Sequence, residues 1–328
     1  MFKPYPIRFR EIYKEVAWGG SRLKTLLGKA IPGGKTGESW EISDHGADTS
    51  SVAGGAFAGK ETLRTLCEKY PREILGSALA AKHRQKFPLL LKFIDANDTL
   101  SVQVHPDDDY ARTHENGAWG KTEAWYIVAA EPGSRLVKGL KHGTKKDEFK
   151  RLLVAGRVEE CLNSFEVSPG DVIHIAAGTV HAIGGGILLA EIQQTSDLTY
   201  RVYDWNRLGL DGKPRETHLE KALDVINFDG PDDSAKLHCP PGPGIQRMAE
   251  CKKLALDVLT LDGGSYESIT GGERFEILCA VEGSGSVAWS GGKTDFRAGT
   301  SLLIPAAIGT YSIKSDGRCR VLRSCVPE

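Results

Sequence analysis

The sequence lacks long apolar runs and any close pairing of cysteines. Its longest apolar stretches, such as 186–190 and 89–91, are far shorter than the roughly 20 residues that cross a bilayer. The seven cysteines are scattered and form no C-x-x-C pair, which argues against a disulfide framework or a structural zinc knuckle. The first ten residues, MFKPYPIRFR, contain no apolar core. We therefore expect no secretory signal and a reducing, cytoplasmic location.

An excess of charge of one sign is also missing. The 42 Lys and Arg residues nearly balance the 43 Asp and Glu residues, and the net charge is -1. Because no basic stripe is present to hold nucleic acid or an anionic membrane, neither is expected as a partner. A small anion would have to be recognised locally by a few cations. The sequence leaves the oligomeric state open between monomer and homodimer.

Short β-rich runs bounded by Gly, Pro, Asp and Asn dominate the chain. The runs with the length and composition of strands are 89–94, 100–105, 124–128 and 171–175. This texture is typical of an antiparallel barrel or sandwich, so the expected fold class is mainly β. Apolar residues at helical spacing predict helices over 61–70, 71–81 and 145–160.

A polar stretch rich in Pro, Asp and Gly, at 231–243, divides the chain. Short strands and glycine turns resume after it and continue to the end of the sequence. We therefore expect a first domain over 1–235, with helical insertions at about 60–86 and 145–161, and a second domain over 236–328.

The C-terminal part repeats the frame of the middle part. Glu123 and Glu276 each open an apolar strand that ends in a glycine turn. Downstream, a shared Gly-x5-(Ala/Pro) frame places Thr310 where the first copy has His181. The second domain is therefore expected to lack metal ligands, and any metal should lie in the first.

Four polar residues of the first copy form a candidate ligand set: Gln103, His105, Glu123 and His181. Gln103 and His105 are two apart on a predicted strand, so their side chains point to the same face. Two imidazoles, a carboxylate and an amide oxygen suit zinc with a position left for water or substrate. Each residue alone is equally well explained as a hydrogen-bonded polar residue of a strand, so spacing alone leaves both interpretations open.

Four motifs occur in a fixed order. They are QVHPDD (103–108), GKTEAWY (120–126), AGTVHAIG (177–184) and EIQQTSDLTYRVYDW (191–205). Together they resemble the short bacterial form of type I phosphomannose isomerase, a family of the cupin superfamily. The resemblance extends over most of the chain up to about Phe228. It implies a mainly β fold of two cupin-type (jelly-roll) β-barrels with a small helical insertion.

The resemblance also implies a function and a site. The family interconverts mannose 6-phosphate and fructose 6-phosphate. Carried over by position, it implies that Gln103, His105, Glu123 and His181 hold one Zn²⁺ per chain. It further implies that Arg201, in the segment TYRVYD, is an essential active-site residue.

The proton-transferring base stays open between two residues. Moving a proton between C1 and C2 through an enediol requires a base, and Lys121 and Glu191 are the candidates. Arg201 is suited to clamp the enediolate or the substrate phosphate, unless it pairs with Asp204 or Asp197 instead. The alternative function is a non-catalytic, metal-bearing cupin that only binds a sugar or sugar phosphate. A lysine and an arginine beside a complete ligand set favour the enzyme, because a binding module has no need of an acid–base group.

Overall fold

The computed structural model describes residues 2–83, 85–230 and 236–327, and its strands form two modules. In the N-terminal module, a seven-stranded sheet has the order β1(Ile12–Gly20), β2(Thr36–Ile42), β5(Leu89–Ala96), β12(Ile187–Gln194), β7(Glu123–Ala130), β10(Asp171–Ile175), β14(Leu237–His238). A five-stranded sheet packs against it in the order β13(Tyr200–Tyr203), β6(Val102–Val104), β11(His181–Ile183), β8(Arg135–Leu140), β9(Leu162–Glu166). The polar groups of the candidate site lie between these two sheets.

The C-terminal module repeats this arrangement with fewer strands. Its first sheet has the order β15(Gly244–Glu250), β16(Ala255–Asp262), β23(Arg318–Cys325), β18(Glu276–Glu282), β21(Ser301–Ile304). Its second sheet has the order β17(Ser265–Ile269), β22(Thr310–Ser315), β19(Ser284–Trp289), β20(Gly292–Arg297). The prediction of a mainly β fold built on two similar sheet modules is confirmed. β14 pairs with β10, so the N-terminal sheet includes residues beyond 235, and the exact domain boundary stays a prediction.

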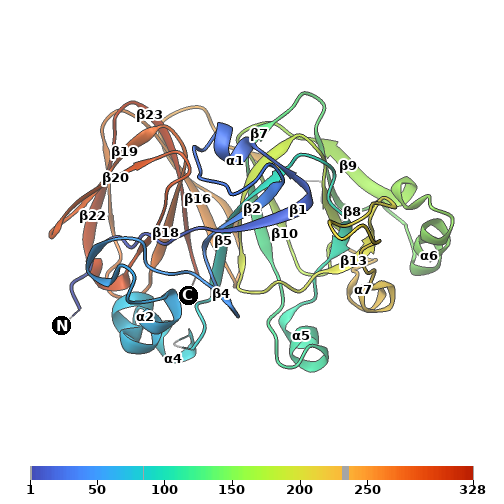
Figure 1. The fold of residues 1–328 in the computed structure, drawn as a ribbon, viewed down its shortest axis with the longest axis horizontal. Helices are drawn as coiled ribbons and strands as arrows, with labels where there is room; N and C mark the ends of the chain where they lie inside the picture. Colours follow the sequence, from blue (N-terminus) through green and yellow to red (C-terminus); the bar gives the residue numbers. More distant parts are fainter. Residues whose placement is uncertain (1, 84, 231–235, 328) are drawn as a thin grey trace.

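Helices lie outside the sheets (Figure 1). They are α1(Arg22–Thr25), α2(Leu63–Lys69), α3(Pro71–Leu75), α4(Ala80–His83), α5(Asp108–His114), α6(Lys146–Val154) and α7(Leu219–Val225). α6 and α7 cover the outer face of the five-stranded sheet, where they share an apolar cluster with β6, β11 and β13. No helix in the described ranges is long and apolar enough to span a membrane.

Two of the predicted helices were too long. The helix expected over 71–81 is two short helices, because Gly76 adopts a φ of 90° that ends α3. A Cβ at this position would lie 2.1 Å from the carbonyl oxygen of Glu273, so the close contact with the C-terminal module requires glycine. Likewise α6 ends at Val154, and Gly156 with a φ of 68° turns the chain into a short 3-10 segment.

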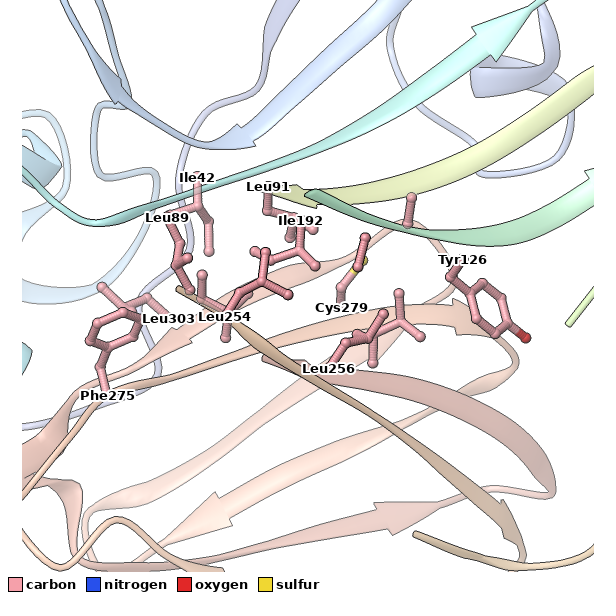
Figure 2. Packing of buried hydrophobic residues seen from close by; sticks show 14 of the residues in the cluster. Ile42, Leu89, Leu91, Tyr126, Ile192, Leu254, Leu256, Phe275, Cys279 and Leu303 are labelled. Atoms are coloured by element: carbon pink, nitrogen blue, oxygen red, sulfur yellow. The ribbon is translucent and has the colours of Figure 1, made fainter. Parts of the chain in front are cut away.

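The two modules meet along an apolar seam between their larger sheets (Figure 2). The N-terminal module contributes Ile42, Leu89, Leu91, Tyr126 and Ile192, and the C-terminal module contributes Leu254, Leu256, Phe275, Cys279 and Leu303. These side chains are almost fully buried, so separating the modules would expose a continuous apolar surface. The C-terminal module is therefore packed against one face of the larger N-terminal sheet.

Candidate metal centre and active site

Three buried side chains converge between the two sheets of the N-terminal module. His105, Glu123 and His181 each offer a ligand atom, and these atoms lie within 4.8 Å of one another. Oε2 of Glu123 lies 3.6 Å from Nε2 of His105, and Oε1 lies 3.4 Å from Nε2 of His181. The sequence separates these residues by up to 76 positions, and the sheets bring them to one point.

Strand register explains why Gln103 joins them. Gln103 on β6 pairs directly with His181 on β11, and directly paired residues of antiparallel strands project to the same face. Their Nε2 atoms are 3.1 Å apart. Because an amide carries oxygen and nitrogen at equal reach, rotation of this amide would present Oε1 to the same centre. The four predicted ligands are therefore together, with Gln103 at the edge of the set.

Both imidazoles are held by backbone carbonyls. Nδ1 of His105 lies 2.8 Å from the carbonyl oxygen of Leu198, and Nδ1 of His181 lies 2.9 Å from that of Thr179. A carbonyl can only accept, so each Nδ1 carries the proton and each Nε2 keeps its lone pair for the centre. Burial, reinforced by Lys121, lowers the pKa of His105 to about 3, and burial also lowers the pKa of His181. Neutral imidazoles are the form that binds metals.

The Glu123 carboxylate tests whether these residues fit a metal. Burial disfavours its charge, yet the Lys121 ammonium beside it holds its pKa well below the usual range. Neither of its oxygens has a hydrogen-bond partner within the described residues. Nζ of Lys121 lies 2.8 Å from Oε2, but Oε1 faces no cation among those residues, and a buried carboxylate oxygen without a donor is costly unless a cation compensates it. Two neutral imidazoles, this carboxylate and an amide oxygen therefore fit Zn²⁺.

Both predicted base candidates contact this set. Nζ of Lys121 lies 2.8 Å from Oε2 of Glu123, 3.2 Å from Nε2 of His105 and 3.7 Å from Oε1 of Glu191. Lys121 precedes β7, so the irregular segment before the strand places it beside Glu123. Burial and the nearby Glu123 raise the pKa of Glu191. A buried carboxyl with a raised pKa beside a lysine is a workable acid–base pair.

A second buried lysine extends this arrangement and was missed from the sequence. Nζ of Lys92 lies 3.2 Å from Oε1 of Glu191 and 3.5 Å from Oε2 of Glu38. Nε1 of Trp125 donates to the other oxygen of Glu191 at 3.0 Å. A signal was present, because Lys92 is a charged residue within a run of apolar residues of β5, and a buried charge needs a partner.

Arg201 lies one strand further along the same sheet. It pairs with Gln103 across β13 and β6, so its side chain starts from the face that carries the ligands. Its Nη1 donates to the carbonyl oxygen of Glu216 at 2.7 Å, while its buried Nε has no hydrogen-bond partner within the described residues. Asp204 forms its ion pairs with Arg207 and Arg215. A pairing of Arg201 with Asp204 is therefore not what the structure shows, and Arg201 keeps donor capacity.

Among the described residues of the C-terminal module, threonine and isoleucine take the places of the histidine and glutamine. Thr310 pairs with Ile269 there, as His181 pairs with Gln103 in the N-terminal module. Neither Thr310 nor Ile269 is a metal ligand of the imidazole or amide kind, and both are exposed. The strand register thus places Thr310 at the position that corresponds to His181, as the sequence frame predicts.

Glu276 keeps the place of Glu123 but is compensated by the protein itself. The Tyr311 hydroxyl donates to its Oε2 at 2.6 Å, and Nη1 of Arg323 lies 3.5 Å from its Oε1. Within the part of the chain that the structure describes, the corresponding carboxylate of the N-terminal module has no such hydroxyl donor. Glu276 thus has a hydroxyl donor on one oxygen and an arginine near the other, whereas Glu123 has Lys121 beside Oε2 and leaves Oε1 open to a metal cation.

Comparison with known proteins shows the family of the chain. The model of the type I phosphomannose isomerase catalytic domain matches residues 7–126, and that of the mannose-6-phosphate isomerase cupin domain matches residues 245–326. The mannose-6-phosphate isomerase ManA of Bacillus subtilis is 35% identical, over 96% of this chain and 98% of its own. The chain belongs to the type I phosphomannose isomerase family.

Solved structures of phosphomannose isomerases share the fold over the whole chain. The crystal structure of mannose 6-phosphate isomerase from Bacillus subtilis superposes with a TM-score of 0.88 at 33% identity, covering 98% of this chain and 99% of that chain. A zinc-bound mannose 6-phosphate isomerase superposes with a TM-score of 0.79 at 17% identity, covering 98% of this chain and 100% of that chain. The second likeness shows the fold alone. The expected cupin architecture is confirmed.

Proposed function

We propose that this chain interconverts D-mannose 6-phosphate and D-fructose 6-phosphate. The observation that carries the proposal is the contact between a metal-binding set and an acid–base pair. His105, Glu123 and His181 converge within 4.8 Å, and Lys121 lies between Glu123 and Glu191. Relatives that carry the name mannose-6-phosphate isomerase align over nearly the whole chain, which supports the substrate.

We assign the metal as one Zn²⁺ held by Gln103, His105, Glu123 and His181. When bound, zinc supplies Lewis-acid stabilisation of negative charge that develops on a substrate oxygen. The protein contributes the orientation of the ligands, because backbone carbonyls fix both imidazoles. The sheets bury His105, Glu123 and His181, while Gln103 stays partly exposed.

The proton transfer falls to Glu191 and Lys121. Isomerisation removes a proton from one carbon of the C1–C2 pair and returns one to the other, through an enediol. Glu191, held by Trp125 and Lys92, takes the carbon-bound proton as a carboxylate, and Lys121 balances its charge at 3.7 Å. Arg201 offers guanidinium donors to the enediolate or to the phosphate.

The remaining assignments concern organisation and location. We place catalysis in residues 1–235 and a supporting role in residues 236–328. All seven thiols are free, which supports a reducing, cytoplasmic compartment. The partner is a small sugar phosphate, and the chain acts as a monomer or homodimer.

Conversion of mannose 6-phosphate tests the function. The zinc-loaded protein is incubated with mannose 6-phosphate, and fructose 6-phosphate is followed by a coupled assay. Chelation should abolish conversion, and added zinc should restore it. Tight binding of the sugar phosphate without any conversion would instead show the non-catalytic, metal-bearing cupin.

A further inference from the structure

Lys253, in the C-terminal module, reaches the segment that carries the catalytic side chains of the N-terminal module. It lies just before β16, and its Nζ forms an ion pair with Oδ2 of Asp108, which is 145 residues away in sequence. Asp108 is the last residue of the motif QVHPDD that contains His105. This contact therefore joins the two modules at the edge of the candidate active site.

The other oxygen of Asp108 holds the segment before β7. Oδ1 of Asp108 accepts a hydrogen bond from the backbone N–H of Gly120 at 2.8 Å and another from Nε2 of Gln194 at 2.9 Å. The side-chain oxygen of Gln194 in turn accepts from the backbone N–H of Thr122 at 3.1 Å. Lys121 is thus the one residue between two backbone amides that Asp108 fixes, the first directly and the second through Gln194.

Close packing adds to these hydrogen bonds. A Cβ on residue 120 would lie 2.3 Å from the backbone carbonyl carbon of Asp107, so only glycine allows the two segments to touch. The backbone N–H of Lys121 donates to the carbonyl oxygen of Pro106 at 3.0 Å. The segments that carry Lys121 and His105 are therefore seated on each other, with Asp108 at their junction.

We infer that Lys253 is a positioning residue for catalysis, acting through Asp108 on the backbone that places Lys121. The inference rests on the proposed function and gives the C-terminal module a role in it. In the described ranges the side chain of Lys253 contacts Asp108 and neither a metal ligand nor the acid–base pair, so it acts only through geometry. Catalysis is sensitive to misplacement of a reacting group by about 1 Å. Loss of the Lys253–Asp108 contact can therefore affect turnover although Lys253 lies outside the active site.

The test compares three variants of the zinc-loaded enzyme. Lys253→Met removes the charge, Lys253→Arg retains it, and Lys252→Met is the matched control, because the neighbouring Lys252 is exposed. The Lys253–Asp108 pair is partly exposed, so we expect Lys253→Met to lower kcat by about two- to tenfold. KM and zinc content should stay at the wild-type values, Lys253→Arg should recover most of the rate, and Lys252→Met should match the wild type.

A second measurement does not depend on the reaction. Hydrogen exchange of the backbone amides of Gly120 and Thr122 should be faster in Lys253→Met than in Lys252→Met, because their acceptors lose an anchor. Unchanged exchange together with unchanged kcat would overturn the inference, as would a loss of rate that follows a loss of zinc. If the wild type fails to convert mannose 6-phosphate, the proposed function fails, while the exchange result still decides whether Lys253 orders this segment.

Discussion

Nζ of Lys121 lies 2.8 Å from Oε2 of Glu123, so a candidate metal ligand and a candidate proton-transfer group are in direct contact. The same lysine lies 3.7 Å from Glu191. A change of charge at either carboxylate is therefore felt by the lysine between them, and the metal centre and the acid–base pair form one electrostatic unit.

Replacing His181 should show that the N-terminal module binds the metal and that the C-terminal module does not. His181→Ala removes an imidazole that backbone and register hold toward the centre, so zinc affinity should fall by at least about 100-fold and turnover should fall with it. Zinc content after dialysis and the rate on mannose 6-phosphate are the measurements. Thr310→Ala, at the matching position of the C-terminal module, is the control and should change neither. Full zinc and full rate in His181→Ala would show that the ligand assignment is wrong.

The roles of Glu191 and Lys121 can be told apart by paired substitutions. Glu191→Gln keeps the shape and the contact with Trp125 but cannot accept a proton from carbon, so kcat should fall by about 10²- to 10⁴-fold with zinc retained. Lys121→Met leaves Glu123 without its nearest cation and should change zinc affinity as well as rate. If Lys121→Met abolishes turnover with zinc intact while Glu191→Gln stays active, Lys121 is the base.

Arg201 should matter for turnover and not for metal binding. Arg201→Ala should keep wild-type zinc content and lose about 10²- to 10³-fold in kcat/KM, because its guanidinium supplies charge to the substrate. Arg112→Ala, which removes an exposed arginine on α5, provides the comparison. A variant at 201 that loses zinc would place this arginine in the support of the metal site instead.

Asp108 should make stability depend on acid pH. Burial opposes its charge, but the contacts with Lys253, Gly120 and Gln194 lower its pKa below the ordinary 3.8. A lowered pKa in the folded state contributes stability above about pH 4, and this is lost as the pH falls through the folded-state pKa. The Lys253 contact is partly exposed, so its share is about 1 kcal/mol at most. The difference in unfolding free energy between wild type and Asp108→Asn should thus shrink from pH 7 to pH 3, and a constant difference would contradict it.

The metal-binding residues could be predicted from the sequence, but the residues that hold the acid–base pair and its backbone in place could not. His105, Glu123 and His181 lie in ordered motifs at strand spacing, so local pattern and family resemblance together located them. Lys92 was overlooked because strand composition marks a run as buried without showing which carboxylates face it across the sheet. The pair of Asp108 and Lys253 joins residues 145 positions apart, and no local pattern encodes a contact between modules. Strand register and module packing decide such contacts.

Isomerisation in deuterated water follows the proposed proton transfer itself. The zinc-loaded protein is incubated with mannose 6-phosphate in ²H₂O, and the products are followed by nuclear magnetic resonance. A metal-assisted proton transfer between C1 and C2 predicts fructose 6-phosphate with solvent deuterium at C1, and no product after chelation. Unchanged mannose 6-phosphate, with neither fructose 6-phosphate nor deuterium at its C2, would show that the chain does not catalyse this proton transfer.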